Sequence, residues 1–153
     1  MTLTLDDLRV NIHHVDRSTL LSSWHWLTGT DQIPIVVTAL GDAFLHAPLG
    51  SGAIRMLAVG PAMVTPIASS LDDFREQLQD DAFVRQHFRP DLVRSLRAAG
   101  IVLGPGEVYS YKIPPALGGT DDLDNLKPLK LEEHFAVFGK LQEHASRLRG
   151  GKR

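Results

Sequence analysis

The sequence contains no cysteine. This absence excludes disulfide bonds, thiolate nucleophiles and cysteine zinc sites, and it is compatible with a reducing compartment. Long hydrophobic runs are also missing, because no stretch approaches the roughly 18 consecutive apolar residues of a membrane span. The first residues include Thr2, Leu3, Asp6 and Asp7 and lack the basic and then apolar pattern of a secretory signal. We therefore expect a cytoplasmic protein with no membrane partner.

The chain has no strong excess of charge of either sign. Lysine and arginine number 16 against 18 aspartate and glutamate residues, which gives a formal net charge of −2 at pH 7. Binding of nucleic-acid phosphates needs a concentrated basic surface, so we expect no direct nucleic-acid partner. The 43% hydrophobic content and the length of 153 residues suit one globular domain. We expect this domain to span residues 1–148, followed by a basic flexible tail at 149–153.

Recognisable catalytic and metal-binding motifs are absent from the sequence. Of the seven histidines, His13 and His14 are adjacent and would point to different sides of a helix. His134 and His144 would lie about 15 Å apart along a helix. The sequence has no G-x-S-x-G nucleophile motif and no glycine-rich phosphate loop with its lysine. We therefore expect no enzymatic activity, no cofactor and no metal.

Hydrophobic spacing in the first half predicts two helices and then a sheet. Apolar residues at spacings of three and four predict a helix over 5–15 and a short helix that Ser18 caps and Gly29 ends. Trp24 and Trp26 would anchor this second helix on the core. Alternation around Phe44 suggests that the sheet has one buried and one wetter face. Short apolar runs separated by turn residues predict an antiparallel meander, with strands within 33–40, 42–49, 53–60 and 62–68.

The second half predicts further helices and strands that complete an α+β fold. Ser69 or Ser70 would cap a helix, Asp80 and Asp81 would open a further turn, and Pro90 would begin a helix that Gly100 ends. Inward-facing residues of the last helix would include Phe135, Phe138 or Val137, Leu141 and Leu148. The elements expected after Gly100 are strands at 101–103, 107–113 and 126–130 and a helix at 131–148. We expect a single domain in which N-terminal helices and a C-terminal helix flank an antiparallel sheet.

The most distinctive stretch covers residues 103–125 and reads LGPGEVYSYKIPPALGGTDDLDN. Its glycines and paired prolines enclose a short aromatic strand. In a strand, Glu107, Tyr109 and Tyr111 share one face while Lys112 points to the other. A structural role is the simpler interpretation of the two tyrosines, and a Glu–Tyr–Tyr surface is the alternative.

This stretch, together with Asn125 and three earlier segments, carries a family resemblance. The earlier segments are Ala39–Phe44, SSLDDFREQLQD at 69–80, and 92–100. Residues 33–144 resemble the C-terminal domain family of type VI secretion DNase-immunity proteins, many members of which are known only as domains of unknown function. The resemblance implies a small cytoplasmic α+β protein that binds and neutralises a cognate toxin, usually a nuclease, and that has no catalysis of its own.

An inhibitor of this kind works through complementary shape and charge, and acidic side chains can replace the phosphates of a nuclease substrate. The candidate partner-binding residues are Glu107, Tyr109, Tyr111, Asp121, Asp122, Asp124, Glu132 and Glu133. Each acidic residue also fits a solvated turn or helix start. The alternative function is a small-molecule-binding or enzymatic domain whose pocket lies beneath the 104–119 loop and is lined by Trp26, Tyr109 and Tyr111.

Overall fold

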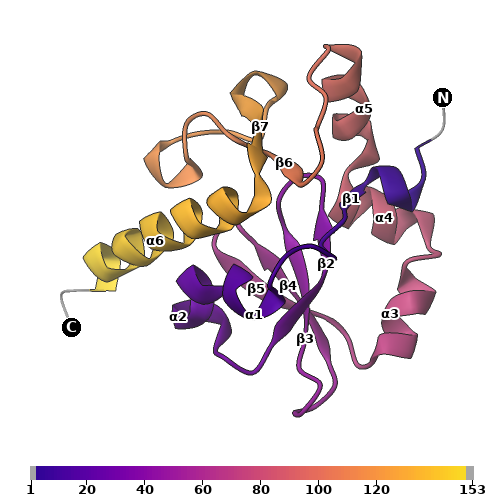
Figure 1. Cartoon of the computed structure of the whole chain (residues 1–153), viewed down its shortest axis with the longest axis vertical. Helices are drawn as coiled ribbons and strands as arrows, with labels where there is room; N and C mark the ends of the chain where they lie inside the picture. The colour runs from indigo at the N-terminus through magenta and orange to yellow at the C-terminus, as the bar shows by residue number, and fades with distance from the viewer. Residues whose placement is uncertain (1–2, 151–153) are drawn as a thin grey trace.

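The computed structural model describes residues 3–150 (Figure 1). The helix predicted over residues 5–15 does not form, so this prediction is wrong. A 3₁₀ turn, η1 (Leu5–Asp7), is followed by the short strand β1 (Arg9–Val10). The backbone N–H of Ala39 donates to the carbonyl oxygen of Leu8 at 2.9 Å, which draws the chain onto the edge of the sheet. Strand pairing therefore overrides the helical spacing of the apolar residues.

The second predicted helix is divided into three short turns: α1 (Arg17–Leu20), η2 (Ser22–Trp24) and α2 (His25–Thr28). Asp16, rather than Ser18, caps α1, because its carboxylate accepts a hydrogen bond from the Ser18 N–H at 3.0 Å. Gly29, with φ of 77°, follows the last turn. Trp24 is fully buried, and its indole N–H donates to the carbonyl oxygen of Phe135 at 2.9 Å. As predicted, Trp24 anchors this segment on the core.

The predicted antiparallel meander is confirmed. Five strands lie in the order β1-β2-β3-β4-β5, and each pairs antiparallel with its neighbours. Pro66 lies in the edge strand β5. Proline has no N–H to donate, and an edge strand tolerates this because it pairs with a neighbour on one side only. The bounds are β2 (Ile33–Thr38), β3 (Ala43–His46), β4 (Ile54–Ala58) and β5 (Met63–Ala68).

Helices cover both faces of this sheet, so the prediction of one wetter face is wrong. Phe44 and Met56 lie in one core cluster, while their neighbours Leu45 and Leu57 lie in a second one on the opposite face. All four are buried. Figure 1 shows the N-terminal helices and the last helix on one side and the helices of the chain's middle third on the other. The alternation therefore divides the strand residues between two apolar cores.

The three middle helices begin and end where local signals predict. Their bounds are α3 (Leu71–Gln77), α4 (Asp81–Phe88) and α5 (Pro90–Ala98). Ser70 accepts a hydrogen bond from the Asp73 N–H at 3.1 Å, and Asp80 accepts one from the Ala82 N–H at 2.9 Å. Arg89 lies between α4 and α5 with φ of 49°, a left-handed conformation that turns the chain sharply.

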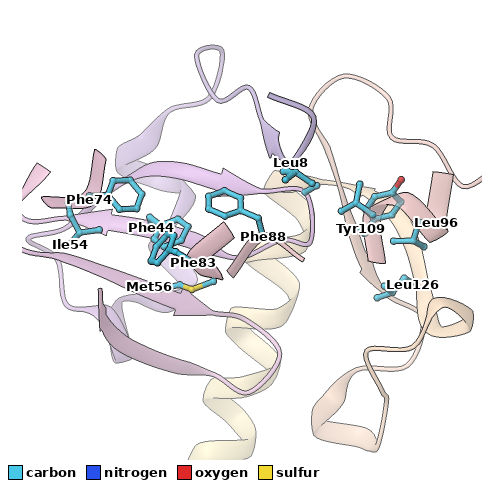
Figure 2. Close-up of a cluster of buried hydrophobic side chains, with 12 residues drawn as sticks. Leu8, Phe44, Ile54, Met56, Phe74, Phe83, Phe88, Leu96, Tyr109 and Leu126 are labelled. Atoms are coloured by element: carbon cyan, nitrogen blue, oxygen red, sulfur yellow. The ribbon is translucent and has the colours of Figure 1, made fainter. Parts of the chain in front are cut away.

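A second sheet pairs β6 (Glu107–Tyr111) with β7 (Leu126–Lys130). Residues 101–103 form no strand, contrary to the prediction. The N–H of Tyr109 donates to the carbonyl oxygen of Ala39 at 2.7 Å and thereby ties the two sheets together. Figure 2 shows Leu8 between the phenylalanine cluster and the group of Tyr109, Leu96 and Leu126. One core cluster therefore runs beneath both sheets.

The last helix, α6 (Leu131–Gly150), follows β7 without a connecting loop. Phe135 and Phe138 face inward as predicted, whereas Val137 and Leu148 are exposed. The expected tail at 149–153 is helical at its first two residues, and 151–153 lie outside the described residues.

Candidate functional site

The segment after β6 is a loop that one side chain closes. The Asn125 amide nitrogen donates to the carbonyl oxygens of Ile113 at 2.9 Å and Thr120 at 2.7 Å. Its amide oxygen accepts the N–H of Ile113 at 2.8 Å. Asn125 is buried, so these bonds are shielded from water. We call residues 112–125 the Asn125 loop, and these three hydrogen bonds hold its backbone.

The paired glycines of the distinctive stretch serve the closure of this loop. Gly118 has φ of 95°, a conformation that favours glycine. A Cβ at residue 119 would overlap the carbonyl oxygen of Ile113 and lie 2.9 Å from the Asn125 amide nitrogen. The glycine pair is therefore explained by backbone packing.

Glu107 also has a local partner. Its carboxylate accepts the Gly104 N–H at 2.6 Å and closes the turn that precedes β6. Lys130, its cross-strand neighbour, donates to the carbonyl oxygen of Pro105 at 3.2 Å. Glu107 thus stabilises the loop on which it lies.

Tyr109 lies in the core, which agrees with the structural interpretation of the two tyrosines and not with the alternative of a Glu–Tyr–Tyr surface. Its side chain is 1% exposed, and its hydroxyl donates to the carbonyl oxygen of Ile101 at 2.6 Å. Burial raises the pKa of this phenol. The period of two predicted correctly that Tyr109 and Tyr111 share a face, but that face packs inward.

A buried polar contact that the sequence analysis missed joins α6 to both sheets. The His134 Nε2 lies 2.9 Å from the carbonyl oxygen of Gly41, and Nδ1 lies 2.8 Å from the Ser110 hydroxyl. Since a carbonyl only accepts, Nε2 carries the proton and Nδ1 accepts from Ser110. Burial lowers the pKa of His134 to about 4, so the ring is neutral at pH 7. His134 lies three residues after Leu131 and four before Phe138, so it shares the inward face of α6 with them. This spacing in the sequence already indicates that His134 is buried.

Tyr111, by contrast, borders a cavity of about 350 Å³ that we call the Tyr111 cavity. It lies where the β2–β3 turn, strands β4 and β5, the α4–α5 corner and the Asn125 loop meet. Its apolar lining includes Leu40, Met56, Leu92 and Leu126, and its polar lining includes Asp42, Thr65, Gln86, His87, Arg89, Tyr111 and Asp121.

Charged groups of both signs meet in the Tyr111 cavity. The Arg89 guanidinium lies 3.4 Å from the Asp121 carboxylate. Burial raises the pKa of Asp42 to about 7 against the hydrogen bond from Val59, with Asp121 raising it further and Arg89 lowering it. Burial also raises the pKa of the Tyr111 phenol, and the charges of Asp42 and Asp121 add to that effect. Asp42 and Arg89 also line this cavity, although no sequence motif pointed to them.

The remaining predicted acidic residues fall into two separate groups. Asp122 and Asp124 are exposed on the Asn125 loop with Asp121. Glu132 and Glu133 are exposed on the first turn of α6 and border a different hollow beside Gly106. Trp26 stacks on Trp24 with ring centroids 5.9 Å apart and does not line the Tyr111 cavity. The structure therefore does not form the predicted pocket of Trp26, Tyr109 and Tyr111.

A larger hollow of about 470 Å³ follows the edge formed by β1 and β2. Its lining includes Asp6, Arg9, His13 and Arg17, which are all exposed. Arg9 already pairs with Asp6 at 2.6 Å. The charged side chains around this hollow are therefore exposed to solvent or paired with one another.

Residues 3–150 contain neither a metal-binding cluster nor a membrane-spanning helix. No group of three or more histidine, aspartate or glutamate side chains in this range is placed to hold a metal ion. No helix in the same range combines the length and the apolar character needed to cross a membrane.

Comparisons with known proteins support the fold and identify one family. The crystal structure of Atu4351 from Agrobacterium tumefaciens is similar, with a TM-score of 0.56 and 15% sequence identity over 80% of this chain. The chain spans 61% of that protein's length, and at this identity the likeness concerns the fold alone. No curated protein matches the sequence. A family model described as "T6SS immunity protein Tdi1, C-terminal" matches residues 68–142, which include Arg89, Tyr111 and Asp121. The family resemblance predicted from the sequence is thus confirmed, because residues 68–142 match the C-terminal domain of type VI secretion immunity proteins.

Proposed function

We propose that the chain is an immunity protein that binds a cognate bacterial toxin in the cytoplasm and neutralises it without catalysis of its own. The observation that carries this proposal is the match of residues 68–142 to the immunity family. Within the proposal, the toxin is a nuclease whose active site or substrate-binding surface is covered by the bound protein.

The geometry of the Asn125 loop supports this proposal. Asp121, Asp122 and Asp124 are exposed on a loop whose backbone is held by the buried Asn125 amide. A surface that is ordered before binding loses less conformational entropy on association. Its carboxylates complement the basic surface with which a nuclease binds phosphates. The loop therefore presents acidic groups in a fixed arrangement that suits a basic partner.

The proposal is tested by co-expression with each toxin encoded next to the gene. We expect survival of cells that otherwise die, and co-purification of a stable complex with a catalytically inactive form of the same toxin. A toxin from an unrelated locus is the matched control and should be neither neutralised nor bound. The proposal fails if no neighbouring toxin is neutralised and none forms a complex.

A second candidate function is binding of a small molecule, and the Tyr111 cavity favours it. Its volume of about 350 Å³ lies at the lower end of the range of ligand sites, roughly 300–1,000 Å³, and its lining mixes apolar walls with polar groups. Thermal denaturation in the presence of a metabolite library tests this candidate. A ligand that raises the melting temperature of the wild type, together with failure of the toxin assays, would favour it.

A further inference from the structure

We propose that the Tyr111 cavity receives the side chain of an arginine supplied by the toxin partner. This inference rests on the proposed function and adds the chemistry by which the partner is recognised. It is carried by the lining of the cavity, by the bonding of Asp42 and by the arrangement of the charges around it.

The lining of the cavity suits a side chain that is apolar along its length and cationic at its end. Leu40, Met56 and Leu92 provide apolar wall, while the carboxylate of Asp42 belongs to the same lining. An arginine buries its methylene groups against apolar surface and keeps its charge for a polar partner. The two parts of the lining therefore match the two parts of one arginine.

Asp42 has bonding capacity that the protein itself leaves unused. One carboxylate oxygen, Oδ1, accepts the Val59 N–H at 2.9 Å. The second oxygen, Oδ2, receives no hydrogen bond from residues 3–150. Asp42 is half-buried, and no buried side-chain oxygen in residues 3–150 lacks a partner, so Oδ2 faces the space of the cavity. Reduced hydration of the carboxylate costs free energy and raises the pKa of Asp42 to about 7. A guanidinium placed beside Oδ2 would remove the cost.

The charged groups around Asp42 leave one negative charge uncompensated when it is ionised. Arg89, from the α4–α5 corner, is paired with Asp121 of the Asn125 loop. His87 of α4 has its pKa lowered by burial, so it supplies no cation at neutral pH. Tyr111 of β6 has a raised pKa and remains a neutral phenol. Two carboxylates therefore face one guanidinium, and a second guanidinium balances them.

Arginine fits this site better than lysine for geometric reasons. A guanidinium offers five N–H donors in a planar fork that pairs with a carboxylate through two parallel hydrogen bonds. It is also less strongly hydrated than an ammonium group, so its transfer into a partly buried site costs less. The neutral Tyr111 hydroxyl provides a further acceptor within the same lining.

The first test uses a probe instead of the toxin. Nα-acetyl-arginine methylamide is titrated into the full chain to about 10 mM, and backbone amide resonances are followed by NMR. We expect saturable shifts at Asp42, Val59 and Tyr111, and no such shifts with the citrulline analogue, which is neutral and similar in shape. Because Asp42 must be ionised, affinity should rise several-fold between about pH 6 and about pH 8. Equal shifts with citrulline, or no shifts around the cavity, would overturn the inference.

Substitution of Asp42 provides the matched comparison. Asp42→Asn retains an oxygen that accepts the Val59 N–H, so the turn is preserved while the charge is removed. We expect this variant to lose the arginine response and its pH dependence. Asp72→Asn, in an exposed position on α3, should leave both unchanged. Retention of the response in Asp42→Asn would contradict the proposed site.

The second test separates this inference from the proposed function. If the wild type binds and neutralises a toxin, Asp42→Asn should weaken the complex about tenfold or more, and Asp72→Asn should not. Equal binding by wild type and Asp42→Asn overturns the cavity inference and leaves the immunity function standing. Failure of the wild type to bind any toxin overturns the proposed function, and the inference of a partner's arginine falls with it, whatever the probe shows.

Discussion

The imidazole Nε2 of His134 lies 2.9 Å from the carbonyl oxygen of Gly41, 93 residues earlier in the chain. The other ring nitrogen meets the Ser110 hydroxyl, so one buried side chain connects α6, β6 and the β2–β3 turn. These three elements position the wall of the Tyr111 cavity at Asp42 and Tyr111.

His134→Ala should destabilise the fold by about 2–4 kcal/mol, because it empties a buried volume and leaves two polar partners unsatisfied. The free energy of unfolding is measured by urea titration at pH 7. His144→Ala is the control, since His144 is exposed on the same helix and its removal should change stability by less than about 0.5 kcal/mol. Equal effects of the two substitutions would contradict a structural role for His134.

Gly41→Ala should cost more than the ordinary penalty for a left-handed residue. Gly41 has φ of 84°, and an added Cβ would overlap the His134 ring. Gly52→Ala is the matched control, because Gly52 has φ of 77° and open space around the added Cβ. We expect about 1 kcal/mol for Gly52→Ala and more than about 3 kcal/mol for Gly41→Ala, measured by urea denaturation. Similar losses would show that the contact with His134 is unimportant.

Asn125→Ala should release the Asn125 loop, because the side chain makes three hydrogen bonds to the backbone of Ile113 and Thr120. Hydrogen exchange followed by mass spectrometry should show faster exchange across residues 113–120. A loss of about 1–3 kcal/mol in unfolding free energy should accompany it. Asp124→Ala, at the exposed neighbouring position, should leave exchange unchanged. Protection of 113–120 equal to the wild type would show that other contacts hold the loop.

Half-buried Asp42 and buried His134 make opposite contributions to the pH dependence of stability. The folded pKa of Asp42, about 7, lies above its usual 3.8, so the native state retains a proton that the unfolded state releases. Its contribution to stability is therefore lost as the pH rises from about 4 to about 7. The folded pKa of His134, about 4, lies below 6.5, so its contribution is lost as the pH falls from about 6.5 to about 4.

Asp42→Asn should separate these two contributions. In the absence of a toxin, the variant should be more stable than the wild type by about 1–3 kcal/mol at about pH 8. This difference in unfolding free energy should shrink toward about pH 4. Chemical denaturation across this pH range measures the difference. A constant difference between variant and wild type would show that Asp42 titrates in the native state as it does in the unfolded chain.

The two groups of acidic residues should contribute differently to toxin binding. Replacement of Asp121, Asp122 and Asp124 by asparagine should slow association with the toxin about tenfold at low salt, because exposed charges act chiefly on the encounter rate. Replacement of Glu132 and Glu133 by glutamine tests the other group at a different place on the surface. Stopped-flow binding measures both rates. A larger loss from the glutamate pair would place the interface beside α6 instead of the Asn125 loop.

Much of the fold could be predicted because its signals are local. Ser70, Asp80 and Pro90 mark helix starts through their own side chains or rings, and the turn residues between short apolar runs indicate a meander. The helix over 5–15 was wrong because Leu8 is buried by the chain's pairing with β2, a contact distant in sequence. Local spacing alone does not distinguish these two uses of a leucine.

The candidate site was harder to predict because its parts are distant in sequence. Asp42, Arg89, Tyr111 and Asp121 lie on four different segments that only the tertiary fold brings together. Both a structural and a surface role stayed open for Tyr109, because a strand's period of two specifies which residues share a face and not which face is buried. The glycines of residues 103–125 are structurally important, and their role is to close backbone turns.

The covering of the five-stranded sheet on both faces has a consequence for how the chain can be divided. Phe74 and Phe135, within the family-matched residues 68–142, pack in clusters that contain Phe44 and Leu57 from upstream strands. An isolated 68–142 fragment would expose these aromatic residues to water and would not fold by itself. During synthesis, the face that α6 shares with the N-terminal helices stays incompletely covered until α6 has left the ribosome. The 68–142 region is thus shorter than the stretch of chain that builds the two core clusters.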